Sequence, residues 1–348
     1  WPWLIQRLRL YDLYLRKKEG VVDYELRGLD HLRDSTNAGH GILLAPNHCR
    51  YADPLVMGWP ARQLGIHVHA MASWHLFNEG GFDAFALRRM GAFSVFREGN
   101  DRQSLETAID ILVQADRPLI VFPEGTTNRT NDALKPLLDG VAFMARTAAK
   151  RRRKANTQGD AKVVIHPVGI KYLCLEPIDR WAHEQLDAFE TQLGWQRLPA
   201  RDVRKRTVQL AEALLVLKEI QYYGHSVGGE LPQRRDALIE HVLSVTEAEM
   251  EVNPPSQEIR ERVREIRSTA SSRYFERHPD PALADHMRRH IQAADLAQDL
   301  SSYPDHYLTE ADATDTRIVE SIQRMQETFF GHADHSVRLK SVIQFAPA

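Results

Sequence analysis

The feature that most constrains the fold of this chain is an alternation of short apolar runs with helical patterns between residues 21 and 173. Strands that alternate with helices predict an α/β fold with a central, mostly parallel sheet flanked by helices. The chemistry of such a sheet is expected in the loops at its strand ends. The predicted strands are Val21–Arg27, Gly41–Asn47, His67–Ser73, Ala92–Arg97, Pro118–Phe122 and Lys162–Leu173, and the clearest helices between them are Arg102–Ala115 and Leu134–Lys150.

The C-terminal part of the chain follows a different pattern. Beyond the turn-rich segment at residues 224–232, apolar residues recur at helical spacing, and Pro residues divide the region into about four helices. The last residues, 336–345, have the composition of a returning strand. We therefore predict three parts: an amphipathic interfacial helix at residues 1–20, an α/β domain at residues 21–229 and an all-helical accessory region at residues 230–348.

The predicted N-terminal helix is amphipathic. Its apolar stripe consists of Trp1, Leu4, Ile5, Leu8, Tyr11 and Leu15, with Arg and Lys residues around and after it. Such a helix either docks on the core or lies in the headgroup layer of a membrane. A second basic segment, Lys150–Lys154, is predicted to be an exposed loop, which is either a solvated turn or a docking site for anionic lipid or a phosphorylated ligand.

Composition limits the possible functions. With 45 Lys and Arg against 47 Asp and Glu, the formal net charge is −2, which argues against a nucleic-acid partner. The two Cys are too few for a disulfide framework, and the 16 His do not cluster with Cys or carboxylates at ligand spacing. We therefore expect a cytoplasmic protein without a metal site. No apolar run approaches the roughly 20 residues that a membrane-spanning helix needs.

The most informative segment joins the apolar strand Gly41–Ala45 to His48 and, five positions later, Asp53. A strand-to-loop-to-helix transition can fold this carboxylate back onto the imidazole. A His oriented by a carboxylate is a general base for a hydroxyl proton. For this pair alone, a structural His beside a helix-capping Asp is an equal alternative. The same spacing recurs at His290 and Asp295, where the surroundings are helical, and we interpret that copy as chance.

Three further segments end predicted strands with polar residues. Arg97 ends one strand, Glu124, Gly125 and Thr126 follow another, and Pro167 lies near the end of a third. A guanidinium is suited to phosphate, and backbone and hydroxyl donors after Glu124 suit a phosphate or a developing oxyanion. A surface cation and an ordinary turn are the alternatives for each segment taken alone.

Together, the four segments resemble those of the glycerolipid acyltransferases, which include lysophosphatidic acid and glycerol-3-phosphate acyltransferases. The family's blocks match Asn47, His48 and Asp53, then Gly91 and Arg97, then Phe122 through Thr126, and finally Val163 to Pro167. The resemblance implies that residues 21–229 are an acyltransferase domain. It also implies transfer of a fatty acyl group from an acyl-CoA or acyl-carrier-protein thioester to a glycerol-backbone hydroxyl.

On this hypothesis His48 is the catalytic base and Asp53 orients it. Arg97 and the turn of Glu124, Gly125 and Thr126 bind the acceptor, with Glu124 fixing the turn or a glycerol hydroxyl. No cofactor is expected apart from the thioester co-substrate. The expected partners are the acyl donor, acyl carrier protein if it supplies the thioester, a lysophospholipid or glycerol phosphate acceptor, and the inner face of a membrane as a peripheral docking surface.

The sequence predicts the acceptor less clearly than the reaction. We expect 1-acylglycerol-3-phosphate before any other acceptor. Phosphate-binding members often continue the third block with Arg and Ser, whereas Thr127 and Asn128 follow here, which resembles members that acylate headgroup-bearing lysophospholipids. Two other functions stay open: a thioesterase or transacylase with Cys49 as nucleophile, and a non-catalytic lipid-binding scaffold.

Overall fold

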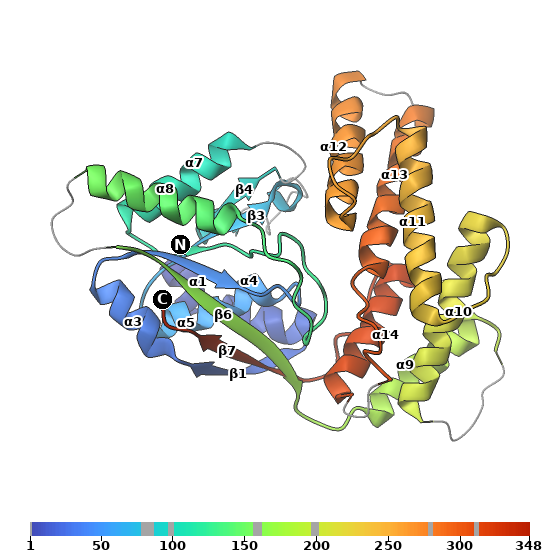
Figure 1. Cartoon of the computed structure of the whole chain (residues 1–348). Coiled ribbons are helices and arrows are strands. Elements are labelled where there is room, and N and C mark those ends of the chain that lie inside the picture. Colours follow the sequence, from blue (N-terminus) through green and yellow to red (C-terminus); the bar gives the residue numbers. More distant parts are fainter. Residues whose placement is uncertain are drawn as a thin grey trace. The chain divides into compact units, whose positions relative to one another are not determined.

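The structure is a computed structural model that describes residues 2–77, 87–96, 101–155, 162–195, 202–277, 281–309 and 313–348. The chain forms two compact units, an α/β unit of Trp1–Pro177 with His335–Ala348 and a helical unit of Ile178–Asp334 (Figure 1). The helical unit begins at residue 178 rather than at the predicted 230. The reason is that the two helices after residue 178 pack with the later helices, while the end of the chain returns to the sheet.

A seven-stranded sheet forms the centre of the α/β unit, with the strand order β1-β7-β6-β2-β5-β3-β4. Its strands are β1 (Val21–Arg27), β2 (Gly41–Pro46), β3 (His69–Ser73), β4 (Ala92–Val95), β5 (Leu119–Ile120), β6 (Val163–Cys174) and β7 (Leu339–Phe345). Neighbouring strands pair parallel, apart from β6 and β7, which are antiparallel. The predicted α/β class, its mostly parallel sheet and the returning C-terminal strand are confirmed.

Helices cover the sheet and supply the core. They are α3 (Leu29–Asn37), α4 (Asp53–Val56), α5 (Gly58–Leu64), α7 (Arg102–Gln114) and α8 (Gly140–Lys154). Apolar residues of α7 and α8, such as Leu112 and Met144, pack with Leu43 of β2 and Leu119 of β5 in one buried cluster. Burial of these side chains stabilises the layers, at roughly 1.5–3 kcal/mol for each large one. The same packing fixes the ends of β2 and β5, from which the candidate site is built.

The basic segment Lys150–Lys154 is helical, so its prediction as a loop was wrong. It forms the last turns of α8, because two of its charges find fixed partners there. Arg152 is buried and donates to the backbone oxygens of Val113 and Gly39, and Arg151 pairs with Glu106 and Asp110 at the surface. Basic side chains in a last turn also interact favourably with the negative end of the helix dipole.

The N-terminal segment is divided where a single helix was predicted. It consists of α1 (Pro2–Arg7), α2 (Leu10–Tyr14) and a π-helical turn at Leu15–Glu19, and the break is at Arg9, whose φ of 52° is left-handed. Tyr11 and Leu15 are buried, and the Tyr11 hydroxyl donates to the Gly58 oxygen of α5. One part of the predicted stripe therefore packs on the core, while Leu4 and Leu8 remain exposed.

The helical unit contains α9 (Asp179–Gln192), α10 (Val203–Tyr223), α11 (Leu231–Glu249), α12 (Ile259–Arg277), α13 (Pro281–Leu300) and α14 (Asp315–Phe330). One face of α12 is apolar and buried: Val263, Ile266 and Ala270 pack with Leu243 of α11 and Ala294 of α13. In the described part of the chain, every helix is too short or too polar to cross a membrane.

Candidate functional site

The site begins where β2 leaves the sheet. Asn47, the first residue after β2, extends the pairing with β6 through its side chain: Asn47 Nδ2 donates to the Ile170 oxygen at 3.0 Å, and Asn47 Oδ1 accepts from the Ile170 N–H at 2.6 Å. This amide acts as one further rung of the ladder, so the backbone that follows is fixed in direction. His48 is therefore placed at the end of the sheet by a residue that belongs to the same sequence motif.

His48 and Asp53 form a buried pair. Asp53 is the first residue of α4 and is fully buried, and its Oδ2 lies 2.9 Å from His48 Nδ1. The same oxygen accepts the Arg50 N–H at 2.9 Å, which closes the loop between the two residues. The predicted fold-back of the carboxylate onto the imidazole is what the structure shows.

The second oxygen of Asp53 has a partner that the sequence motif does not contain. The hydroxyl of Tyr172, on β6, donates to Asp53 Oδ1 at 2.6 Å. Burial of the Tyr172 phenol, with the Asp53 charge beside it, raises the pKa of Tyr172 well above its usual value. The phenol therefore stays protonated as a donor, and Asp53 accepts hydrogen bonds on both oxygens, as a buried carboxylate must.

The other ring nitrogen of His48 faces a hydroxyl. His48 Nε2 lies 3.0 Å from Thr127 Oγ1, and the ring stacks on Phe122 with 4.1 Å between ring centroids. A carboxylate beside Nδ1 holds the proton on that nitrogen, which leaves Nε2 as the hydrogen-bond acceptor. The imidazole is thus oriented as a base toward an oxygen at hydrogen-bond distance, within the reach of about 2.6–3.2 Å that proton abstraction requires.

Glu124 holds the loop that carries Thr127. Its carboxylate is fully buried; Oε1 accepts the His48 N–H at 2.7 Å, and Oε2 accepts from Asn128 Nδ2 at 2.8 Å and the Lys135 N–H at 3.0 Å. Charge-assisted bonds of this kind are the strong ones in proteins. Of the two roles predicted for Glu124, the geometry supports fixing the turn. It connects two loops, one that follows β2 and one that follows β5, into a single unit.

The turn after Glu124 requires glycine. Gly125 has a φ of +73°, and a Cβ there would lie 2.7 Å from Leu138 Cδ1, so any side chain would be strained. Thr126 is half-buried in the same turn. These two predicted residues therefore lie in the loop that carries Thr127 to the His48 ring.

Arg97 lies outside the described residues, so the structure does not place its side chain. The strand before it is described: β4 begins after Gly91, whose φ of +98° and close approach to the Val68 oxygen explain the glycine of that motif. The described site thus consists of the His48–Asp53 pair, the Glu124 turn, Thr127 and Tyr172.

Cys49 is poorly placed to act as a nucleophile. Its side chain is fully buried, with Sγ 3.6 Å from the Ile170 oxygen and 3.8 Å from Asp53 Oδ1. Nucleophilic cysteines occupy electropositive, partly exposed surroundings, whereas Cys49 has a carboxylate and a carbonyl as neighbours. The thioesterase alternative therefore has no support from this geometry.

Part of the α/β unit is similar to known proteins. Residues 24–171 match the family model for the acyltransferases. This part of the chain is similar to the acyltransferases. A stretch of 146 residues is also 27% identical to a 1-acyl-sn-glycerol-3-phosphate acyltransferase of Streptococcus pneumoniae (strain ATCC BAA-255 / R6), covering 41% of this chain and 52% of the relative. The chain thus spans about half the length of that relative. These matches confirm the family predicted from the four motifs.

Proposed function

We propose that this protein is an O-acyltransferase of phospholipid biosynthesis or remodelling. It moves a fatty acyl group from an acyl-CoA or acyl-carrier-protein thioester to a hydroxyl of a glycerol-phosphate-type lipid. The observation that carries the proposal is the orientation of His48 within an acyltransferase-family domain. Its Nδ1 is held by buried Asp53, and its Nε2 accepts from a hydroxyl at 3.0 Å.

In the proposed reaction the acceptor hydroxyl takes the position of the Thr127 hydroxyl on His48 Nε2. The acceptor oxygen attacks the thioester carbonyl carbon while Nε2 removes its proton, and Asp53 stabilises the imidazolium that forms. Collapse of the tetrahedral intermediate breaks the C–S bond, and the leaving sulfur takes the proton back from the imidazolium. The products are an ester and a free thiol, and His48 is neutral again.

Thr127 marks the position of the reacting oxygen. A threonine hydroxyl and an acceptor alcohol offer the same donor to the imidazole, so exchanging one for the other leaves the hydrogen bond of Nε2 satisfied. Because Thr127 belongs to the loop that Glu124 fixes, its position is defined to the same degree as that of His48. General-base assistance of this kind contributes about 10²–10⁴-fold in rate.

The proposed acceptor is 1-acylglycerol-3-phosphate. Support comes from the name of the pneumococcal relative and from the motif that contains Arg97, a forked donor suited to phosphate. A lysophospholipid with a headgroup is the second candidate, and it is favoured by Thr127 and Asn128 at the positions where phosphate-binding members often have Arg and Ser. Both acceptors present a glycerol hydroxyl to His48 and differ only in what lies beyond the phosphate.

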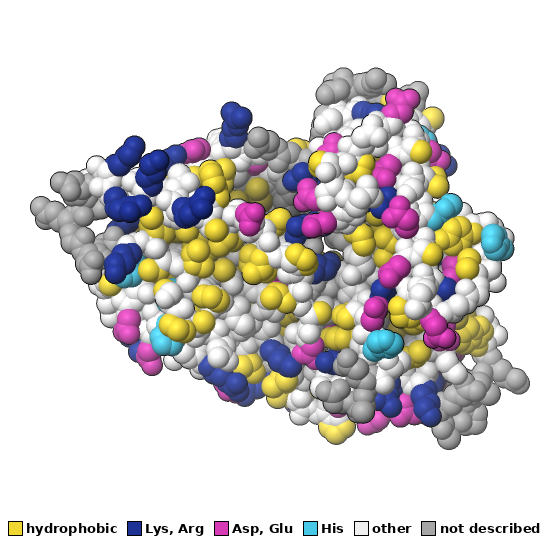
Figure 2. Space-filling model, in the orientation of Figure 1, with side chains coloured by type: hydrophobic (Ala, Val, Ile, Leu, Met, Phe, Trp, Pro, Cys, Tyr) yellow, Lys and Arg dark blue, Asp and Glu magenta, His cyan; other side chains and the backbone are white. Residues whose placement is uncertain are grey.

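We place the protein on the inner face of a membrane as a peripheral protein. In the N-terminal segment Trp3, Leu4 and Leu8 are exposed by 61%, 38% and 54%, which suits insertion at the headgroup boundary. Figure 2 shows hydrophobic side chains gathered on a face of the α/β unit and Lys and Arg side chains over α8. Basic groups beside exposed apolar ones favour an anionic lipid surface.

One incubation tests the proposed reaction directly. The purified chain is mixed with labelled acyl-CoA, labelled acyl-carrier protein, glycerol 3-phosphate and a panel of lysolipids, and products are identified by mass. We expect acylated 1-acylglycerol-3-phosphate as the main product, and a headgroup-bearing product selects the second candidate. Tight binding of lipids without any acyl transfer contradicts the proposal and favours the lipid-binding scaffold. The same reaction with Cys49→Ser keeps most of its rate if no cysteine nucleophile is involved.

The membrane proposal has its own test. Vesicles containing anionic phospholipid are floated with the wild-type chain and with a variant in which Trp3, Leu4 and Leu8 are changed to Asp. We expect the variant to stay at the bottom of the gradient. Flotation equal to that of the wild type rules out a docking role for the N-terminal segment.

A further inference from the structure

We propose that His286, His290 and Glu249 of the helical unit bind a divalent transition-metal ion, with Zn²⁺ as the best match to the ligand set. The three residues lie outside the region that matches the acyltransferase family, so this site is separate from the proposed reaction. Two imidazoles and one carboxylate are ligands that zinc sites use, with water completing the coordination.

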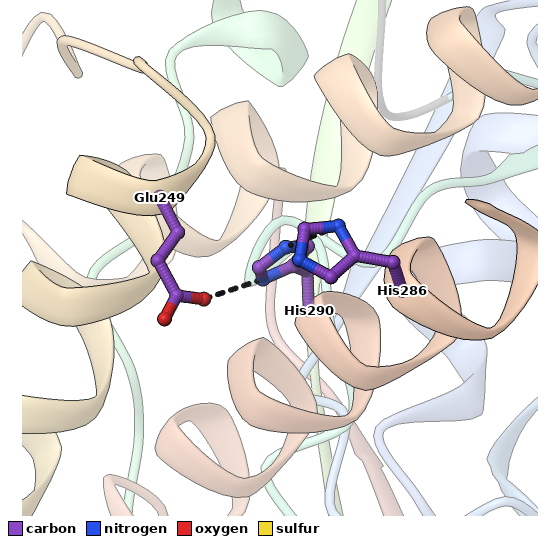
Figure 3. Close-up of side chains that lie close together, drawn as sticks. All are labelled: Glu249, His286 and His290. Atoms are coloured by element: carbon purple, nitrogen blue, oxygen red, sulfur yellow. Dashed lines mark hydrogen bonds and ion pairs between the residues drawn. The ribbon is translucent and has the colours of Figure 1, made fainter. Parts of the chain in front are cut away.

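The helical unit brings the three ligands together from two helices. His286 and His290 are one turn apart on α13, and Glu249 is the last residue of α11 (Figure 3). One ligand atom from each residue can be chosen so that all lie within 4.8 Å of one another. Two His at positions i and i+4 of a helix face the same side and form a chelating pair.

The spacing of the imidazoles matches that of a metal-bound pair. His290 Nε2 lies 3.2 Å from His286 Nδ1. In a tetrahedral site with Zn–N bonds of 2.0–2.1 Å, two nitrogen ligands are about 3.3–3.4 Å apart. An ion between the two nitrogens therefore requires only a small outward shift of the rings, which meet edge to face with 4.2 Å between centroids.

Glu249 supplies the negative charge. Its Oε2 lies 3.7 Å from His290 Nδ1, and its side chain is 56% exposed, so it is free to rotate toward an ion. The carboxylate also stands at the C-terminal end of α11, where the helix dipole favours a cation. A carboxylate beside a metal-bound His strengthens such a site, whether it contacts the ion or the ring.

Burial and nearby charge set the expected affinity. His290 is buried, whereas His286 and Glu249 are exposed. Arg273 and Arg289 act on the same ring as positive charges. Arg273 is held by a 2.7 Å bond to the Met250 oxygen, at the end of α11. These cations oppose metal binding, so we expect micromolar rather than nanomolar affinity.

The test is a titration of the full-length chain, freed of metal with a chelator, by ZnCl₂ in a calorimeter and by CoCl₂ in a spectrophotometer. We expect one ion per chain and a visible Co²⁺ absorption typical of nitrogen and oxygen ligands. The exposed variants His286→Ala and Glu249→Gln should weaken Zn²⁺ binding by about 10–100-fold. His225→Ala and Glu251→Gln, exposed residues of the same unit, serve as matched controls and should bind like the wild type.

The outcomes separate the proposal from its alternative, a plain hydrogen bond between two imidazoles. Absence of stoichiometric binding up to millimolar Zn²⁺ overturns the proposal, and so does binding that His286→Ala leaves unchanged. Circular dichroism of each variant confirms that the helices are intact. Because no acyl substrate is present, the result does not depend on the proposed reaction.

Discussion

The spacing His-x-x-x-x-Asp occurs in both units of this protein and has a different outcome in each. In the α/β unit the chain passes from β2 through a loop to α4, and Asp53 lies 2.9 Å from His48. In the helical unit His290 and Asp295 lie on one helix, where two residues five positions apart are separated by roughly 140° around the axis. Asp295 pairs there with Arg267, and His290 turns to His286 and Glu249. The spacing therefore forms a dyad only when the backbone between the two residues is not helical.

The first test replaces each of the two aspartates, Asp53 and Asp295, by asparagine. Asp53→Asn should lower kcat by about 10³–10⁴-fold, because an amide no longer fixes the His48 tautomer or stabilises the imidazolium. Asp295→Asn should leave kcat unchanged and alter only the surface pair with Arg267. Steady-state acyl transfer by the two variants measures the difference. An equal kcat for the two variants would show that the pair of His48 and Asp53 is structural.

A second test removes the partner of Asp53 that the motif does not contain. Tyr172→Phe deletes the 2.6 Å bond to a buried carboxylate, which should cost about 1.5–3 kcal/mol in the free energy of unfolding. Without this bond Asp53 is held less firmly, so it orients the His48 imidazole less well and kcat should fall. A loss of stability with an unchanged kcat would mean that Tyr172 has no influence on the dyad.

A smaller effect, on the pH dependence of stability, is expected from a substitution of Glu19 at the end of the π-helical turn. The pKa of Glu19 is raised to about 7, mainly by burial. The positive charge of Arg50 lowers this pKa in part, and the negative charge of Asp53 raises it further. The folded state thus binds this proton more tightly than the unfolded state, whose carboxyl has an ordinary pKa near 4.5. Stability from this group is complete below about pH 4.5 and is lost as the pH rises through 7. Glu19→Gln should therefore raise the urea midpoint at pH 8 and leave it almost unchanged at pH 4.5.

Glu219 of the helical unit has a lowered pKa, whereas that of Glu19 is raised. Hydrogen bonds from the Arg234 side chain, and after them the Val227 N–H, lower the pKa of this fully buried carboxyl. Glu219→Gln should destabilise the chain at pH 8, since it leaves Arg234 without its charged partner. Stabilisation at pH 8 by both Gln variants would refute the account of Glu19, because it would show a general effect of removing negative charge.

Much of the fold could be predicted because local pattern determined it. β1 has the predicted bounds, and β2, β6 and α7 differ from theirs by a residue at their ends. Predictions failed where tertiary contacts decided. Arg152 of the basic segment is buried against two backbone oxygens, which keeps the segment in α8. A left-handed Arg9 splits the first helix so that Tyr11 and Leu15 reach the core.

Only those contacts of the candidate site that join residues close together in the sequence could be predicted. His48 and Asp53 are five residues apart, and the motif with its flanking strand indicated their contact. Tyr172 is 119 residues from Asp53 in the chain and belongs to an ordinary strand pattern, so nothing in the sequence marked it. Thr127 was noted as a departure from the family's pattern, but its contact with Nε2 depends on the Glu124 turn. No metal site was expected from the sequence, because Glu249 joins His286 and His290 only through the packing of α11 on α13.

The central claim is that His48 is the base of an acyl transfer, and thiol release by His48→Ala tests it most directly. Purified variant and wild type are given acyl-CoA with and without the acceptor identified by mass, and free thiol is measured over time. His31→Ala, an exposed histidine of the same unit, is the matched control. We predict that His48→Ala loses about 10²–10⁴-fold in acceptor-dependent thiol release while keeping its circular dichroism spectrum. Release at the wild-type rate by folded His48→Ala would contradict the mechanism.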